Sequence, residues 1–246
     1  METFDIVLLT LFIFIGAALY STVGHGGASA YLAVMALLGL PPILMKPIGL
    51  VLNILVSSIA TIRFYKAKCF SWSIFLPISL AAIPFAYIGG SIAIPSHWYK
   101  IIAGIILLFS AIRLFYYKPA QDKPLNRMPL SIAVIAGILI GFLSGLVGVG
   151  GGIFLSPLLL FMGWSNPRTT SGISAAFIFV NSVSGLLGHS PNLLDLPAYL
   201  PLLAVAAITG GIIGSRFGSK QQVQHTTILR LLAVVLIIAG LKLILV

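Results

Sequence analysis

The sequence has 246 residues, of which 59% are hydrophobic and 7% are charged, and its mean hydropathy is +1.14. A soluble domain carries roughly 25% charged residues, so this composition excludes a soluble globular protein and predicts an all-α polytopic membrane protein. The net charge of +10 does not indicate nucleic-acid binding, because the Lys and Arg residues are scattered at the ends of apolar segments and form no basic stripe.

The chain opens with an apolar stretch, METFDIVLLTLFIFIGAALY, whose first charged residues are Glu2 and Asp5. A secretory signal peptide begins with basic residues, so we expect a retained first membrane segment instead. The single cysteine, Cys69, excludes an intramolecular disulfide and a cysteine-based metal cluster.

Apolar runs separated by charges or by Pro and Gly predict ten membrane segments. A crossing helix needs about 20 apolar residues. Two runs are shorter, and both follow a cluster of glycines; they are either short crossings or half-helices that turn back within the membrane. The expected segments are 5–23, 27–40, 45–65, 71–94, 98–117, 129–148, 152–163, 168–188, 197–216 and 226–246.

The basic residues orient these segments. If the N-terminus lies outside and the path alternates, eleven Lys and Arg residues fall inside and only Lys46, Lys100 and Lys242 fall outside. Cytoplasmic loops carry the excess of positive charge. The distribution therefore predicts an external N-terminus.

The second half of the chain repeats the first at a shift of 125 residues. Most of the identities are Gly, Pro or Ser, although apolar sequences also align by chance. We expect a first membrane repeat over 1–118, a cytoplasmic linker over 119–128 and a second repeat over 129–246. Each repeat holds five segments, an odd number, so the second would be inverted, as in many secondary transporters. The matched pairs are Gly16 with Gly141, Gly26 with Gly151, Gly27 with Gly152, Pro42 with Pro167, Ile48 with Ile173, and Ser57 with Ser182.

Two glycine clusters, VGHGG at 23–27 and GVGGG at 148–152, occupy matching places before the short segments. Irregular backbone at membrane depth is tolerated only where it is buried in protein or lines a wet cavity. A helix that starts there directs its unpaired N–H groups and partial positive charge at a ligand. The clusters therefore predict two helix breaks that share an anion site. The second cluster lacks the GxGxxG spacing of a nucleotide-binding loop.

Other glycines and prolines have structural interpretations. Small residues spaced four apart favour close helix packing, and two such ladders occur, at 137–145 and 210–218. Pro42 and Pro167 are typical of helix starts, with Asn166 as the cap of the second.

Polar residues inside the membrane are costly and therefore candidates for function. His25 either contacts an anion and carries a proton, or is a satisfied structural residue. Asn53 and Asn181, which are 128 residues apart, either donate to substrate as a pair of amides or bond neighbouring helices. For the serines of the same two segments we favour bonding between helices: Ser57, Ser58, Ser182 and Ser184.

The remaining polar and aromatic residues are expected at segment ends. His97, His189 and His225 should be solvated, and Trp72, Trp98 and Trp164 should act as interfacial anchors. The four acidic residues, Glu2, Asp5, Asp122 and Asp195, all fall in expected tails or loops. The carboxylate relay of many proton pumps is therefore missing, which favours an anion or a neutral solute.

The run GFLSGLVGVGGGIFLSPLLL, followed by NPRTTSGISAAFIFVNSVSG, resembles the sulfite exporter TauE/SafE family, also called toluene sulfonate uptake permeases. The resemblance covers nearly the whole chain. The first half departs from it with VGHGG and Lys46-Pro47. The resemblance implies transport of sulfite, sulfonates or related sulfur-containing anions across the bacterial inner membrane.

We therefore expect a secondary transporter, an exporter of a small sulfur-containing anion, with protons as one candidate coupling ion and a homodimer as one candidate assembly. A passive anion channel, or an uptake permease for thiosulfate or another oxyanion, is the alternative. A membrane-embedded enzyme is disfavoured, because no HExxH, GxSxG or buried carboxylate pair occurs; no cofactor, metal or catalytic residue is expected. The predicted substrate-binding residues are Gly24, His25, Gly26, Gly27, Asn53, Gly148, Gly150, Gly151, Gly152, Thr170, Ser171 and Asn181.

Overall fold

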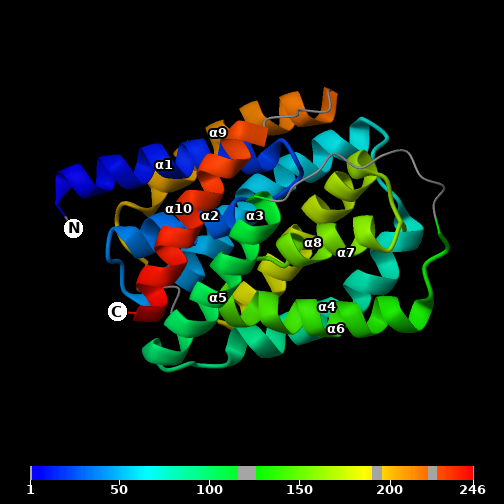
Figure 1. Ribbon diagram of the computed structural model, residues 1–246, viewed down its shortest axis with the longest axis horizontal. Helices are drawn as coiled ribbons and strands as arrows, with labels where there is room; N and C mark the ends of the chain where they lie inside the picture. Colours follow the sequence, from blue (N-terminus) through cyan, green and yellow to red (C-terminus); the bar gives the residue numbers. More distant parts are fainter. Residues whose placement is uncertain (1, 116–125, 190–195, 221–225, 246) are drawn as a thin grey trace.

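The computed structural model describes residues 2–115, 126–189, 196–220 and 226–245, and within these ranges it contains ten α-helices and no strand (Figure 1). The all-α prediction and the ten segments are confirmed. The helices are α1 Thr3–Ser21, α2 Ala28–Leu37, α3 Pro42–Lys66, α4 Trp72–Ser91, α5 Ser96–Phe115, α6 Leu130–Val147, α7 Gly152–Phe161, α8 Pro167–Gly188, α9 Leu200–Lys220 and α10 Thr226–Leu245.

The helix starts follow local sequence chemistry. α3 and α8 both begin with proline, whose fixed φ suits the first helical position. The Asn166 side chain accepts a hydrogen bond from the backbone N–H of Thr169 at 2.9 Å, as expected of a cap. α9 continues to Lys220, past the expected end at residue 216, because Arg216 is exposed and a long basic side chain can extend out of an apolar helix end.

Six of the described helices are long and apolar enough to cross a membrane: α1, α3, α4, α6, α8 and α9. The protein is a multi-pass membrane protein. α2 and α7 have 10 residues each, and at 1.5 Å per residue such a helix is about 15 Å long. The hydrocarbon core is about 30 Å thick, so neither short helix spans it alone.

The same helix pairs recur in the two halves. α1 lies along α9 and α4 lies along α6, on opposite sides of the molecule (Figure 1). α3 packs on α9 as α8 packs on α4, and α3 and α8 pack on each other in the centre. α5 pairs with α10. Helices that match at the 125-residue shift thus have matching neighbours, which supports the internal repeat; its inversion stays a prediction.

The two glycine ladders pack helices, as predicted. α6 contributes one ladder against α4 and α9 contributes the other against α1. A Cβ atom on any ladder glycine would overlap a backbone carbonyl of the facing helix, so the backbones approach closely. The overlaps are Gly137 with Ile78, Gly141 with Ala82, Gly145 with Ala86, Gly210 with Phe14, Gly214 with Ala18, and Gly218 with Thr22.

Two expectations about segment ends are wrong. Trp164 is buried in a core cluster that includes Phe75 and Leu159, whereas Trp72 and Trp98 are exposed as predicted. Asp5 lies in the first turn of α1, where it forms a capping box with Glu2, because negative charge is favourable at a helix N-terminus.

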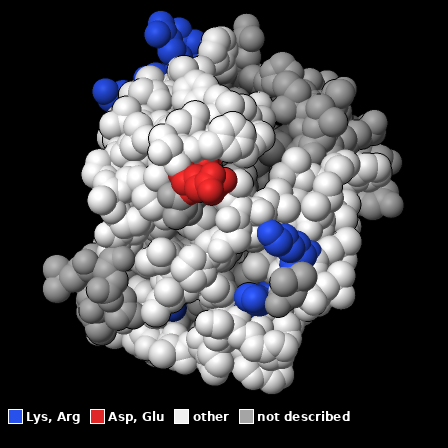
Figure 2. Space-filling model, turned by 90° about the vertical axis from the view of Figure 1, so that its left-hand side faces the viewer, with Lys and Arg blue, Asp and Glu red and all other residues white. Residues whose placement is uncertain are grey.

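The charged side chains are few on the face that carries the start of α1. Figure 2 shows one acidic patch there, formed by Glu2 and Asp5, together with scattered basic side chains on a mainly uncharged surface. Asp122, Asp195 and His225 lie outside the described residues. His97 is exposed, as expected.

Candidate functional site

Both glycine clusters break the helical path. Left-handed φ angles occur at Gly24 and Gly27 in the first break and at Gly148, Gly150 and Gly151 in the second. Gly27, with φ of 98°, and Gly151, with φ of 81°, are the N-caps of α2 and α7. A side chain at such a φ is strained, which explains why glycine occupies these positions. The predicted breaks before the two short helices are confirmed.

The two breaks converge on the middle of α3 and α8. A Cβ atom on Gly26 would lie 2.5 Å from Asn53 Oδ1 and 3.1 Å from Ile178 Cγ2. A Cβ atom on Gly150 would lie 2.7 Å from Ile178 Cγ2 and 2.9 Å from both Asn53 Nδ2 and Ser182 Oγ. One break from each half therefore contacts the same two side chains. We call these five residues, Gly26, Asn53, Gly150, Ile178 and Ser182, the central site.

The central site contains buried polar atoms without partners. Asn53 is fully buried, and neither its Nδ2 nor its Oδ1 has a hydrogen-bond partner within the described part of the chain. The hydroxyl of Ser182 is also buried without a hydrogen-bond partner among the described residues. Leaving a buried polar group unpaired costs about 1–3 kcal/mol, and an exception of this kind in a native structure needs an explanation. A polar ligand at the central site would supply one.

His25 connects the first break to the second half. Its Nε2 lies 3.1 Å from the Gly152 carbonyl oxygen and 3.0 Å from Ser156 Oγ. Because a carbonyl oxygen only accepts, the first contact requires that Nε2 carries hydrogen and donates. Ser156 Oγ in turn lies 2.7 Å from Ser174 Oγ. A hydrogen-bonded chain therefore runs from the first break through α7 to α8.

The other predicted residues support the breaks or lie beside them. The backbone of Ser171 would be overlapped by a Cβ atom on Gly24, and Asn181 uses its amide nitrogen within α8, donating to the Phe177 carbonyl at 2.9 Å. Thr170 is buried, and its hydroxyl has no partner among the described residues. Around the remaining glycines, the nearest side chains are Tyr31 for Gly27, Lys46 for Gly148, Ile140 for Gly151 and Ile178 for Gly152.

A family model described as sulfite exporter TauE/SafE matches residues 8–243. The chain belongs to the TauE/SafE family. It is 37% identical to the "Probable membrane transporter protein y4hK" of Sinorhizobium fredii over 96% of both chains. It is 27% identical to the "Probable membrane transporter protein MJ0441" of Methanocaldococcus jannaschii over 91% of both chains. No solved structure matches. These comparisons identify a membrane transporter rather than an enzyme.

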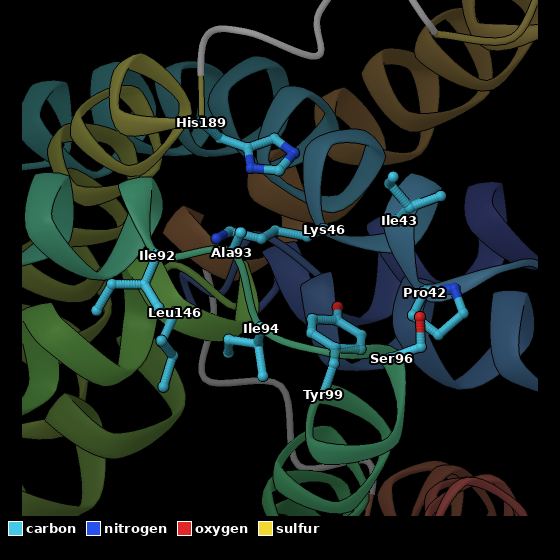
Figure 3. Close-up of a pocket in the computed structure, with 10 residues that line it drawn as sticks. All are labelled: Pro42, Ile43, Lys46, Ile92, Ala93, Ile94, Ser96, Tyr99, Leu146 and His189. Carbon is cyan, nitrogen blue, oxygen red and sulfur yellow. The ribbon is translucent and has the colours of Figure 1, made fainter.

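This TauE/SafE protein also has a cavity of about 130 Å³ beside the second break. We call it the Lys46 cavity. Figure 3 shows Lys46 lying across it, between His189 and Tyr99. The lining residues are Pro42, Ile43, Lys46, Ile92, Ala93, Ile94, Ser96, Tyr99, Leu146 and His189. The expectation that His189 is simply solvated is wrong, because it is half-buried at the end of α8 and faces the lysine.

Several residues near the two breaks of this TauE/SafE protein were not predicted as site residues from the sequence. Ile178 has no polar group, and its position against both breaks depends on how α3 and α8 cross. Ser156 and Ser174 carried a usable signal, since each is a polar residue within an apolar segment. In the sequence analysis Lys46 served as a topological charge and as a departure from the family pattern. It was not a site candidate, although a lysine four residues inside a helix that begins at Pro42 is unusual in a membrane segment.

Acidification should destabilise the protein through His189. Burial, and then the positive charge of Lys46, lower the pKa of this imidazole, and a hydrogen bond with the Gly90 carbonyl partly opposes them. An unfolded histidine titrates near pH 6.5, so below that pH the unfolded state binds more protons than the folded state and stability falls. The melting temperature of the wild-type protein should therefore drop more steeply than that of His189→Gln between about pH 7.5 and pH 5. Parallel curves would show that His189 remains solvated, because the other histidines are common to both proteins.

Proposed function

We propose that this protein is a secondary transporter that exports a small sulfur-containing anion, such as sulfite or an organosulfonate, across the bacterial inner membrane. The observation that carries the proposal is the convergence of the two breaks on the unpaired amide of Asn53. The amide nitrogen can donate to an oxyanion. Gly26 and Gly150 lie so close to Asn53 and Ile178 that a methyl group does not fit between them, so in this proposal these side chains move apart to admit the anion.

The helix arrangement favours a negative charge at the central site. α2 begins after the first break and α7 after the second, so both positive helix ends are next to the place where the breaks converge. Of the described residues, the only acidic ones are Glu2 and Asp5 at the start of α1. A cation at the central site would therefore lack a counter-charge.

His25 is the candidate for coupling transport to protons. It is the titratable group of the first break, and its hydrogen bonds to Gly152 and Ser156 join the two halves. Protonation would add a hydrogen at Nδ1 and a positive charge beside the first break, while Nε2 keeps the hydrogen that it donates to Gly152. In this proposal the N-terminus lies outside, as the distribution of basic residues predicts.

The experiment is transport by purified protein in liposomes. Labelled sulfite, thiosulfate, methanesulfonate, a monovalent cation and a neutral amino acid are tested with and without an imposed proton gradient. We expect one or more sulfur anions to accumulate against their gradient. Accumulation of the cation or neutral solute alone would overturn the proposal. Ohmic single-channel currents, with no accumulation, would replace it with a passive anion channel.

A further inference from the structure

Lys46 is a buried cation with no carboxylate partner among the residues that the structure describes. Its side chain is 5% exposed, and its ammonium group donates to the Gly90 carbonyl at 2.8 Å and, more weakly, to the Gly89 carbonyl at 3.4 Å. The acidic residues that the structure describes are Glu2 and Asp5, at the start of α1. Burying a charge is expensive unless it is paired. A lysine ammonium has three donors, so two carbonyls leave capacity for another acceptor.

Capping of α4 is the alternative role for Lys46. Gly89 and Gly90 lie in the last turn of that helix, whose carbonyls favour a cation. The second half has a cap of the same kind, since Arg168 Nη2 donates to the Ser219 carbonyl in the last turn of α9 at 3.0 Å. Arg168, however, is exposed. Burial beside a cavity therefore distinguishes Lys46 from a cation that only caps a helix.

The Lys46 cavity is suited to a small anion. A cavity needs roughly 10–15 Å³ to hold one water molecule, and this one has about 130 Å³. Its polar lining consists of the Lys46 ammonium, the His189 ring, the Tyr99 hydroxyl and Ser96, and Figure 3 shows the first three grouped around its middle. None of the lining residues that the structure describes is acidic.

The cavity also borders the second break. A Cβ atom on Gly148 would lie 3.2 Å from Lys46 Cγ, and the Tyr99 hydroxyl donates to the Val147 carbonyl at 3.0 Å, just before the break. At the first break, Gly24 faces the backbone of Ser171. Ser171 is the residue of the second half that matches Lys46 at the 125-residue shift. The positively charged residue is therefore present beside one break and replaced by serine beside the other.

We propose that the Lys46 cavity is a second anion-binding site, through which a sulfite-, sulfate- or sulfonate-like oxyanion passes between the outer face and the central site. Lys46 selects for negative charge, and Ser96 and His189 complete the binding surface. The site rests on the proposed function for its role in transport, but the binding itself does not depend on Asn53. The Lys46 cavity makes the anion affinity unequal at the two ends of the transport pathway, with the higher affinity at the end that carries Lys46.

The test measures the apparent Kd from the rise in melting temperature of detergent-purified protein as sodium sulfate or sodium methanesulfonate is added. We expect Lys46→Gln to weaken binding about tenfold or more, because the charge-assisted contact is lost, and Lys46→Arg to retain it. The matched control is Arg168→Gln, which removes another helix-capping cation, one that does not line the cavity. It should lower the melting temperature without anion and leave the apparent Kd unchanged. Wild-type affinity in Lys46→Gln would reduce Lys46 to a cap of α4 and overturn the site.

A second measurement needs no Lys46 variant and remains available if that protein fails to fold. The groups that face His189 in the described part of the cavity are Lys46 from α3 and Tyr99 from α5, whereas the segment between α4 and α5 and the end of α6 contribute uncharged side chains. Protonation of His189 adds positive charge, so wild-type affinity for methanesulfonate, whose charge is constant, should rise as the pH falls. His189→Gln should abolish that rise. A pH-independent wild-type affinity would contradict the proposal.

The two proposals fail in different ways. If Lys46→Gln loses anion binding but liposomes transport no sulfur anion, the cavity site stands and the proposed function fails. If liposomes accumulate a sulfur anion and Lys46→Gln is unchanged in binding and transport, the function stands and the cavity site fails.

Discussion

Replacing Gly150 with alanine should abolish transport while the protein still inserts and folds. A Cβ atom there would lie within 2.9 Å of Ile178, Asn53 and Ser182, so the methyl group displaces these side chains. Displacing binding groups by about an ångström costs an enzyme about 100-fold, and we expect a loss of that size in the initial rate of sulfite uptake by liposomes. The left-handed φ of 77° adds roughly 1–2 kcal/mol of strain.

Gly39→Ala is the matched control for that strain. Gly39 has a φ of 74°, nearly that of Gly150, but a Cβ atom on it would meet nothing within 4 Å. Both variants should lose the stability that corresponds to the left-handed strain, and Gly150→Ala should lose more because its Cβ overlaps neighbouring side chains. Only Gly150→Ala should lose transport. Gly26→Ala tests the same contact without left-handed strain, because Gly26 does not have a positive φ. A Cβ atom on Gly26 would meet Asn53 Oδ1 at 2.5 Å. Normal transport by both Gly26→Ala and Gly150→Ala would rule out the central site.

Asn53→Leu should separate function from stability. The amide is fully buried and has no described partner, so an apolar side chain of similar size relieves a penalty of about 1–3 kcal/mol. The melting temperature should stay the same or rise. Transport should fall roughly tenfold to a hundredfold, because a hydrogen bond to a charged ligand is worth about 1.5–3 kcal/mol. Uptake rates and melting temperatures of the same preparations provide the measurement.

The control for Asn53→Leu is Ser184→Ala. Ser184 is also buried in the membrane part of the protein, and its hydroxyl donates to the Ile83 carbonyl at 2.6 Å, between α8 and α4. Its loss should reduce stability by about 0.5–1.5 kcal/mol and spare transport. If the Asn53→Leu protein were less stable than the wild type and still transported sulfite at the normal rate, Asn53 would be a structural residue with a partner of its own.

The local features of the fold were predictable from sequence. Apolar runs defined all ten helices, and the glycine clusters located both breaks, because glycine alone adopts the angles found at Gly27 and Gly151 without strain. The ladders and the proline starts follow from equally local rules. Trp164 was misplaced because its burial depends on Phe75, which comes from α4, as well as on Leu159 of the preceding helix α7.

The central site was predictable only in part. Asn53 stood out as an amide inside a membrane segment, but its neighbours depend on packing between the two halves. The residue of α8 that contacts both breaks is Ile178, which matches Asn53 at the 125-residue shift. Asn181 does not take this place, because its amide nitrogen donates to a carbonyl of its own helix. Hydropathy gives no signal for such a position. The same holds for His189, whose approach to Lys46 requires the end of α8 to meet the start of α3.

The cross-pairing of the outer helices has a consequence for how the molecule can move. α1 and α3 are joined to α9 from the second half, and α4 is joined to α6 and α8. A rearrangement that keeps these pairs intact would divide the chain into two interleaved bodies, each built from both halves, that rock along the contact of α3 with α8. The hinge would then run through the central site. Neither half expressed alone would contain a complete moving body.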